Sequence, residues 1–317
     1  MYYIGIDLGG TNIAGGVVSE DHKILLKKSV RTGADRGPDA VAKDIAALIV
    51  SLTEEAGLSL HDIAAAGIAS PGAINSADGI VERACNLYME GYPLTEKVKE
   101  HLPRPDLKLT IENDANAAAL GEAVTGAAKG SRFSVMITLG TGVGGGIVLD
   151  GKVYSGFNYA GAEFGHMVIE HGGRLCNCGR RGCWEAYSSA TALVEMTKER
   201  MEKPGGETLR RLSEEYGKVS ARTAFIAQRA GDPAGCEVVE TYIDYLACGI
   251  SNVINLLSPD IVTIGGGICN EGDALLRPLT EKVYREIFTK NYTVKTEIKI
   301  AALGNDAGII GGAAAAW

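Results

Sequence analysis

Three cysteines and two histidines lie close together in a glycine-rich part of this sequence. The cysteines are Cys176, Cys178 and Cys183, and either His166 or His171 could add an imidazole nitrogen as the fourth donor. Three thiolates and one imidazole form a closed tetrahedral zinc site with no position left for a reactive water, so we expect a structural Zn²⁺. The alternative is a set of free thiols in a glycine-rich loop, which would gain little stability from such close spacing.

Two glycine-rich turns follow apolar, strand-like segments and could bind phosphate. Their small residues expose backbone N–H groups and hydroxyls, which suit phosphate oxygens. A tight hairpin that needs positive φ explains either turn alone equally well, and only the pair favours phosphate. The first turn consists of Gly9, Gly10, Thr11 and Asn12, and the second of Gly140, Thr141 and Gly142.

Two common nucleotide-binding motifs do not fit these turns. Gly140, Gly142 and Gly145 satisfy the spacing GxGxxG, but residues 146–151 continue as a strand and a turn, whereas a dinucleotide-binding fold needs a helix there. The P-loop pattern also fails, because no Lys-Ser or Lys-Thr pair follows the glycines. We therefore reject both motifs.

Asn113 and Asp114 stand where a strand over residues 107–111 gives way to an alanine-rich helix over residues 115–128. That position is the carboxyl edge of a sheet, where α/β proteins bind ligands. Helix capping explains an Asn or Asp here without any function. If the site is functional, the Asp114 carboxylate could accept a proton from a substrate hydroxyl.

The elements that would position these residues alternate in an α/β pattern. Pro38 begins a helix that Gly57 ends, and the strands around it have apolar residues throughout. Three strands followed by alternating helices and strands predict an α/β sheet covered on both faces. The predicted strands cover residues 2–8, 13–18, 24–30, 63–69 and 107–111, and a further short helix covers residues 94–101.

The opening strand and its turn recur near Ser131. At an offset of 131 residues (137 minus 6), five positions carry the same residue: Ile6 and Ile137, Leu8 and Leu139, Gly9 and Gly140, Gly15 and Gly146, and Val17 and Val148. An internal duplication is the simplest explanation. Beyond the repeat we expect a long helix capped by Asp232 and Pro233, a strand over residues 261–264 and a closing helix over residues 305–316.

Size, composition and charge exclude several classes of protein. A chain of 317 residues exceeds one usual hydrophobic core, which favours two domains. With 46% hydrophobic and 22% charged residues, it is neither disordered nor a disulfide scaffold. Its 31 basic and 39 acidic residues give a formal charge of −8 without a basic cluster, so we expect no nucleic-acid partner.

The sequence also predicts a cytoplasmic location. The N-terminus reaches Asp7 before an apolar run develops, so it lacks the pattern of a signal peptide. The longest apolar stretch, residues 246–268, contains polar residues and a proline, so we expect no membrane span. Seven cysteines without an export signal indicate reduced thiols.

Taken together, the motifs resemble the ROK family of sugar kinases and, within it, the bacterial glucokinases. The resemblance implies an actin-like, ribonuclease H-like fold of two domains that close over ATP and a hexose. The motifs are DLGGT (7–11), SPG (70–72), ENDANAA (112–118), LGTGVGGG (139–146), GAEFGH (161–166) and CNCGRRGCWE (176–185).

The resemblance also implies a role for each matching residue. Asp114 would be the general base, Asp7 would lie near Mg²⁺, and His166, rather than His171, would be the zinc ligand. The sugar ligands would be Gly72, Asn113, Glu163, His166 and Glu185. The phosphates would lie near Gly9, Gly10, Thr11, Asn12, Thr141 and Gly142, and the adenosine near Gly266 and Gly267.

The resemblance further implies an N-terminal lobe of residues 1–118 and 303–317 and a C-terminal lobe of residues 119–302, with the zinc loop at 161–185. No proline- or serine-rich linker appears, so the lobes are expected to share helices at a hinge. A homodimer is expected from the resemblance alone.

Glucose, converted to glucose 6-phosphate, is the leading substrate. Alternatives are N-acetylmannosamine, N-acetylglucosamine and fructose. A sugar-responsive repressor of the same family would carry a helix-turn-helix domain ahead of the first turn, and only six residues precede Asp7 here. A sugar-binding module without catalysis is disfavoured by Asp114.

Overall fold

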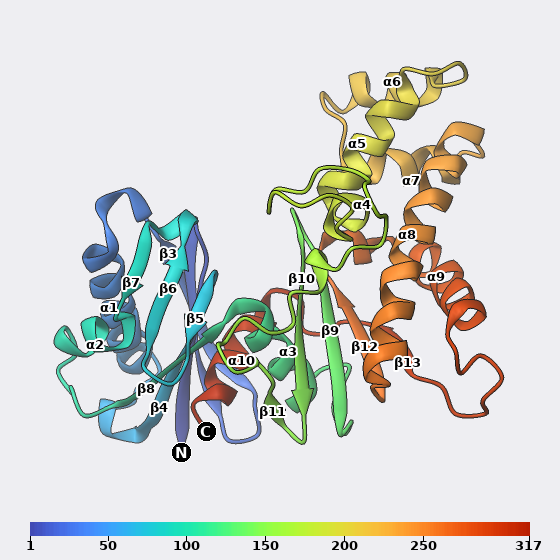
Figure 1. Cartoon of the computed structure of the whole chain (residues 1–317). Helices are drawn as coiled ribbons and strands as arrows, with labels where there is room; N and C mark the ends of the chain where they lie inside the picture. The colour runs from blue at the N-terminus through green and yellow to red at the C-terminus, as the bar shows by residue number, and fades with distance from the viewer. The chain divides into compact units, whose positions relative to one another are not determined.

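The first sheet has the strand order β3-β2-β1-β4-β8 (Figure 1). Strands β1 (Tyr2–Leu8), β2 (Asn12–Ser19) and β3 (Ile24–Arg31) are antiparallel, as the predicted opening strands require. Strands β4 (Ile63–Ser70) and β8 (Lys108–Asn113) add in parallel to β1. The carboxyl ends of β1, β4 and β8 therefore meet at one edge of the sheet, where ligands bind in open α/β sheets.

Successive residues of strand β1 lie on opposite faces of the first sheet. Its isoleucines are fully buried in a core shared with α1 (Pro38–Glu55). The opposite face is covered by α10 (Ala307–Ala315), because a Cβ added at Gly5 would overlap the carbonyl of Ile309. Asp7 lies on this second face, where a Cβ added at Gly308 would lie 2.7 Å from its Cγ. The close approach of α10 thus depends on glycine and fixes the surroundings of Asp7.

The second sheet repeats the order of the first as β11-β10-β9-β12-β13. Its strands are β9 (Phe133–Leu139), β10 (Val143–Leu149), β11 (Lys152–Val153), β12 (Ile261–Gly265) and β13 (Glu297–Ile300). Each sheet places its first strand third in the order, with the next two strands of the repeat on one side and two later strands on the other. The predicted duplication is confirmed by this shared topology.

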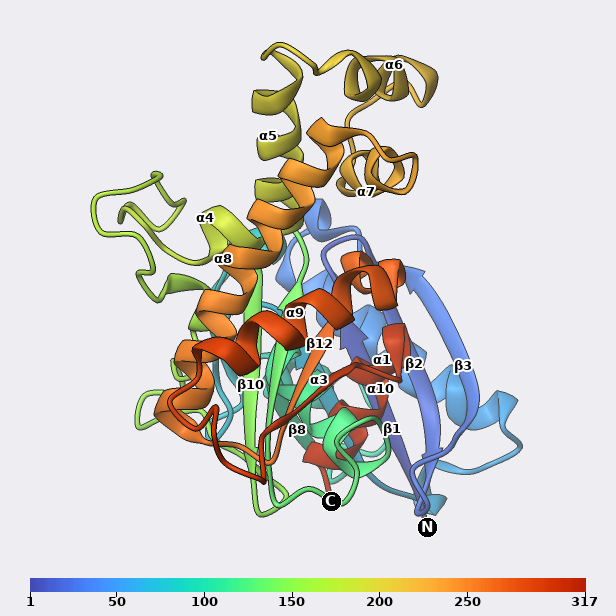
Figure 2. The ribbon, with the colours of Figure 1, turned by 90° about the vertical axis from the view of Figure 1, so that its right-hand side faces the viewer.

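Five helices lie between β11 and β12 in the chain, and a sixth lies between β12 and β13. The longest, α8, begins as predicted, because the Asp232 side chain accepts the N–H of Gly235 at 2.8 Å and Pro233 occupies the first turn. It packs against α9 (Figure 2). The helices are α4 (Glu185–Ser188), α5 (Ala190–Met201), α6 (Glu207–Glu215), α7 (Ala221–Arg229), α8 (Pro233–Leu257) and α9 (Asp273–Glu286).

Helix α3 (Asp114–Val124) is shorter than the expected residues 115–128. It packs against α10 through small residues, since a Cβ at Gly121 would lie 2.6 Å from the carbonyl oxygen of Ala307. The expected closing helix also begins later, at Ala307, after a 3-10 turn. A three-stranded sheet that the sequence did not predict comprises β5 (Ala73–Asn75), β6 (Ile80–Ala84) and β7 (Met89–Tyr92), and the short helix α2 (Leu94–Glu100) follows it.

The computed structural model describes residues 1–317 and divides into two units. Unit 1 comprises Met1–Met136, Gly146–Ala162 and Ala301–Trp317, and unit 2 comprises Ile137–Gly145 and Glu163–Ile300. The boundary expected between residues 118 and 119 lies inside α3, which stays in unit 1 because it packs on α10. Among all helices, none is both long and apolar enough to span a bilayer.

Candidate active site

The junction of β8 and α3 places two polar side chains at the carboxyl edge of the first sheet. The Asn113 Oδ1 atom accepts the N–H groups of Ala115 at 3.0 Å and Asn116 at 3.2 Å, and its Nδ2 donates to the Gly72 carbonyl at 3.0 Å. Asp114 is exposed, and its Oδ1 accepts the N–H of Ala115 at 2.8 Å. The capping explanation therefore applies to Asn113, and it leaves the second oxygen of Asp114 outside the cap.

A buried carboxylate just before them fixes this junction. Glu112 is 8% exposed and accepts the backbone N–H of Asn113 at 2.8 Å. The same Oε1 accepts Nδ2 of Asn116 at 3.0 Å, and Oε2 accepts the hydroxyl of Ser76 at 3.1 Å. Sequence reasoning missed this role. The only available signal was a charged residue at the end of an otherwise apolar strand.

Asp7 and Asp114 repel each other within unit 1. Burial first, and then the negative charge of Asp114, raise the pKa of Asp7 to about 6. Two carboxylates that destabilise each other's charge form a place where a cation is favoured. The pair thus fits a divalent cation with oxygen ligands such as Mg²⁺.

The first glycine turn joins β1 to β2 beside Asp7. The N–H of Gly9 donates to the Asn12 carbonyl at 2.9 Å, and the Thr32 hydroxyl donates to the Gly9 carbonyl at 2.6 Å. Neither Gly9 nor Gly10 has positive φ. The turn does close a hairpin, in which Leu8 pairs with Ile13, but its glycines do not adopt the positive φ that this explanation required. Gly10 and Thr11 are exposed, as a phosphate-binding turn requires.

The second glycine turn is fastened by a carboxylate from another part of unit 2. This turn joins the neighbouring strands β9 and β10 as a hairpin, but Gly140 and Gly142 again lack positive φ. The N–H of Val143 donates to Glu185 Oε2 at 3.0 Å. A Cβ added at Gly142 would lie 3.0 Å from Glu185 Cδ and would overlap Oε2. Gly142 is therefore needed for the approach of Glu185, whereas a Cβ at Gly140 would meet nothing within 4 Å.

The end of β12 lies against the same turn. Gly266 has a φ of +104°, and a Cβ there would lie 2.7 Å from the carbonyl carbon of Leu139. Thr191 fixes the turn from α5, because its hydroxyl donates to the Thr141 carbonyl at 2.9 Å. The structure thus brings Gly266 against Leu139, which directly precedes the second turn.

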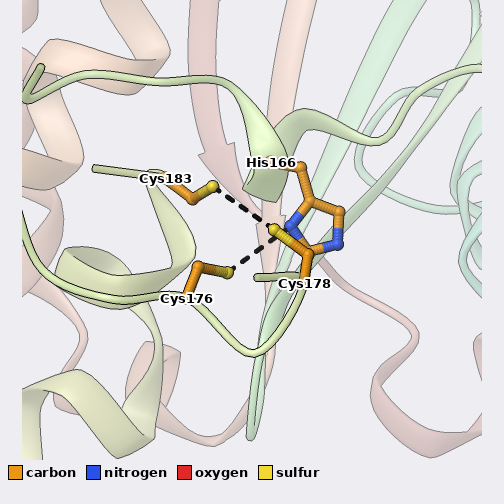
Figure 3. Close-up of side chains that lie close together, drawn as sticks. All are labelled: His166, Cys176, Cys178 and Cys183. Carbon is orange, nitrogen blue, oxygen red and sulfur yellow. Dashed lines mark hydrogen bonds between the residues drawn. The ribbon is translucent and has the colours of Figure 1, made fainter. Parts of the chain in front are cut away.

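His166 and the three cysteines converge on one point (Figure 3). Their donor atoms all lie within 4.8 Å of one another, with 3.6 Å between the sulfurs of Cys178 and Cys183 and 3.7 Å between Cys176 Sγ and His166 Nδ1. Zinc–sulfur bonds of about 2.3 Å in a tetrahedron place sulfurs about 3.8 Å apart, so the cluster fits a zinc ion. His171 is exposed and lies outside this group.

The cysteine loop folds as a short hairpin that aims Glu185. The N–H of Cys176 donates to the Arg180 carbonyl at 2.8 Å. Trp184 is fully buried and donates through Nε1 to the Tyr245 carbonyl at 3.0 Å, which anchors the start of α4. Glu185 then accepts a hydrogen bond from Cys176 Sγ at 3.7 Å through Oε1. One carboxylate therefore connects the metal-ligating loop to the second turn.

A cavity of about 260 Å³ borders both of these elements. It is lined by Thr141 of the second turn, by Cys176 and Glu185, and by Arg174, which pairs with Glu199 at 2.6 Å. On the other side of the loop, Glu163 Oε2 lies 4.0 Å from His166 Nε2. His166 thus directs one nitrogen to the thiols and the other to a carboxylate.

Comparison with known proteins identifies the family. Residues 3–317 match the ROK family along nearly the whole chain. The chain belongs to the ROK family. This ROK protein is 39% identical to a glucokinase of Thermotoga maritima, with 98% of this chain and 95% of the relative covered.

Two solved structures support the same placement. A ROK glucokinase of Streptomyces griseus in complex with glucose and AMPPNP matches with a TM-score of 0.79 at 33% identity, covering 99% of this chain and 98% of that chain. A ROK hexokinase of Thermus thermophilus matches with a TM-score of 0.81 at 31% identity, covering 99% and 97%. The expected actin-like fold of two α/β domains is confirmed.

The predicted site residues of this ROK protein fall into two groups. The group in unit 1 contains Asp7, Gly9, Gly10, Thr11, Asn12, Gly72, Asn113 and Asp114. The group in unit 2 contains Thr141, Gly142, Glu163, His166, Cys176, Cys178, Cys183, Glu185, Gly266 and Gly267. Within each group, the contacts described above join side chains from distant parts of the sequence.

Proposed function

We propose that this ROK protein transfers the γ-phosphoryl group of ATP to the 6-hydroxyl of glucose and so makes glucose 6-phosphate. Its similarity to glucokinases over nearly its full length supports the activity and the substrate. The observation that carries the proposal is the carboxylate pair of Asp7 and Asp114 at the carboxyl edge of the first sheet. Asp7 can interact with a cation, while Asp114 can accept a proton from a hydroxyl group.

Asp114 would act as the general base. Its carboxylate accepts the Ala115 N–H, and an ionised carboxylate is an acceptor that can take a proton from a hydroxyl. Asp114 is the first residue of α3, and its position is fixed because Glu112 and Asn113 hydrogen-bond the backbone at the junction of β8 and α3. Phosphoryl transfer passes through a loose transition state that depends mainly on positioning and charge, so one well-placed base is sufficient.

Asp7 would face the magnesium that accompanies ATP. A bound Mg²⁺ would neutralise phosphate oxygens during transfer. Asp7 itself would orient the water ligands of that ion, and the raised pKa of Asp7 would return toward its usual value when the positive charge arrives. The two glycine turns would hold phosphate oxygens, with Gly9 to Asn12 on one side and Thr141 and Gly142 on the other.

The sugar would be bound by acceptors from both groups. Asn113 and the backbone at Gly72 would contact it from unit 1, and Glu163, His166 and Glu185 from unit 2. Carboxylates and imidazole nitrogens accept hydrogen bonds from ring hydroxyls, which is how polar sites select a sugar.

Zn²⁺ would have a structural role in this arrangement. It would be held by Cys176, Cys178, Cys183 and Nδ1 of His166, which fills all four tetrahedral positions. That bond would fix the ring so that Nε2 remains directed to Glu163 and the sugar. Burial raises the pKa of Cys176 to about 12, so metal binding must displace a proton from this thiol.

The test is a coupled assay of ADP release with glucose, mannose, fructose, N-acetylglucosamine and N-acetylmannosamine. We expect the highest kcat/KM with glucose. A preference for an N-acetylhexosamine would replace the substrate but keep the reaction, because only the surroundings of carbon two distinguish these sugars. Release of ADP with none of the five would overturn the proposal.

Two further properties belong to the same proposal. A homodimer is proposed, and sedimentation at assay concentrations as a monomer would refute it. A cytoplasmic location is proposed because ATP and seven unpaired cysteines suit a reducing compartment. Localisation of a tagged chain to the cell exterior would refute that placement.

A further inference from the structure

Glu122 is a fully buried carboxylate in the last turn of α3. It has no basic partner, and three backbone N–H groups donate to it instead. Oε2 accepts the N–H of Ala127 at 2.6 Å and that of Ala302 at 3.1 Å, and Oε1 accepts the N–H of Leu303 at 2.8 Å. Burying an acid is costly without such bonds, so the three donors are required where the structure places them.

The donors belong to two segments of unit 1 that lie close in sequence to its boundaries with unit 2. Ala127 lies in the outgoing connector, residues 125–132, which follows α3 and leads into β9. Ala302 and Leu303 lie in the returning connector, residues 301–306, directly after the chain re-enters unit 1 at Ala301. The Glu122 carboxylate therefore hydrogen-bonds both connectors near their first residues, although Glu122 and Leu303 are 181 positions apart.

The same carboxylate is linked to both acids of the active site. Asp114 begins α3, and eight residues at 1.5 Å each put Glu122 about 12 Å further along the same rigid helix. The returning connector leads into α10, whose Gly308 lies against Asp7. Glu122 thus fastens the helix that carries one acid to the segment that places the other.

We propose that Glu122 is a positioning residue that makes the two connectors and the helix of Asp114 move as one body. The proposal rests on the role of Asp114 proposed above. The clamp fixes α3 to both connectors and so keeps Asp114 in register with the reacting hydroxyl. A misplacement of about 1 Å at a reacting group costs about a hundredfold in rate.

The test compares the variant Glu122→Gln with the unmodified enzyme. The Gln side chain has the same shape, but its NH₂ group cannot accept a hydrogen bond, so one or two of the three backbone N–H groups lose their acceptor. We expect kcat to fall about ten- to a hundredfold, in line with that misplacement cost, while KM for glucose changes less than about threefold.

A matched control is Arg104→Gln, which also removes backbone hydrogen bonds inside unit 1. The Arg104 Nη1 atom donates to the carbonyls of Leu60 at 2.7 Å and Ile63 at 2.9 Å, away from α3. We expect a similar drop in thermal stability with kcat retained. Retention of kcat in Glu122→Gln, or an equal loss of kcat in the control, would overturn the positioning role.

Hydrogen exchange provides a measurement that does not need turnover. In the unmodified chain we expect the amides of Ala127, Ala302 and Leu303 to be equally protected. In Glu122→Gln, or in Glu122→Asp if that variant does not fold, all three should lose protection together while α1 amides keep theirs. Independent exchange of the two connectors would refute the clamp, even if no sugar is phosphorylated and the proposed function has failed.

Discussion

Replacing Asp7 by Asn should stabilise the free protein while impairing catalysis. Burial and the charge of Asp114 raise the pKa of Asp7 from 3.8 to about 6. At neutral pH the Asp7 carboxylate is ionised, and its negative charge is less favourable in the folded protein than in the unfolded chain. One pKa unit corresponds to 1.36 kcal/mol, so the difference is worth about 3 kcal/mol.

The sign of the effect fixes its pH dependence. Between pH 3.8 and about 6 the folded state binds more protons at Asp7 than the unfolded state does. The contribution of this group to stability is complete below pH 3.8 and is lost as pH rises through 6. The advantage of Asp7→Asn should be absent near pH 4, grow through this window and level off near pH 7.

The assay is urea unfolding at several pH values without Mg²⁺ or nucleotide, with circular dichroism as the signal. Asp150→Asn is the matched control, because a hydrogen bond from Arg132 lowers the pKa of Asp150 and its loss should destabilise the protein slightly at neutral pH. The raised pKa of Asp7 would be refuted if Asp7→Asn were only as stable as the unmodified protein at pH 8. It would also be refuted if the difference in free energy of unfolding did not change with pH.

The remaining predictions concern the base, the metal and the second turn. Asp114→Asn should lower kcat by about 10²- to 10⁴-fold, the usual contribution of a general base, while calorimetry still detects glucose binding; near-normal kcat would remove the base assignment. Elemental analysis should find about one zinc per chain, consistent with one four-ligand site, and Cys183→Ser should lose the metal and raise KM for glucose; full activity without zinc would contradict this role. Gly142→Ala should lower kcat/KM about ten- to a hundredfold, since it displaces Glu185 from a charge-assisted hydrogen bond of about 1.5–3 kcal/mol. Gly140→Ala should change kcat/KM little, because the added Cβ meets no atom within 4 Å. Equal effects of the two alanines would show that Glu185 does not hold the turn.

Local patterns were sufficient to predict much of this architecture. Strand β1 has alternating faces that the sequence displays directly, and the Asp232-Pro233 pair marks the start of α8 because capping involves neighbouring residues. The duplication was visible because the two opening strands share residues at a fixed offset. The cysteines were predictable as a group because zinc ligands have restricted spacing.

Contacts between distant residues were not predictable in this way. Strands β5 to β7 are short and partly exposed, so they have no strong apolar period. The glycine turns were interpreted through φ, yet Gly142 is small because Glu185 approaches it, and Glu185 is 42 positions from the neighbouring Val143 to which it bonds. Spacing alone did not choose between His166 and His171; the family resemblance favoured His166, and the folded loop places His166 with the cysteines.

The two repeats have the same strand order but different chemistry at their turns. At the offset of 131 residues, Thr138 stands where Asp7 stands, so only the first repeat has an acid before its turn. The second turn instead interacts with a carboxylate from elsewhere in the chain, because the Val143 N–H donates to Glu185 Oε2. Glu185 also accepts a hydrogen bond from Cys176, so the second turn is linked to the cysteine loop. Duplication thus explains two turns at equivalent strand ends, and the first differs from the second because its own strand supplies an acid, whereas a distant helix supplies the carboxylate at the second.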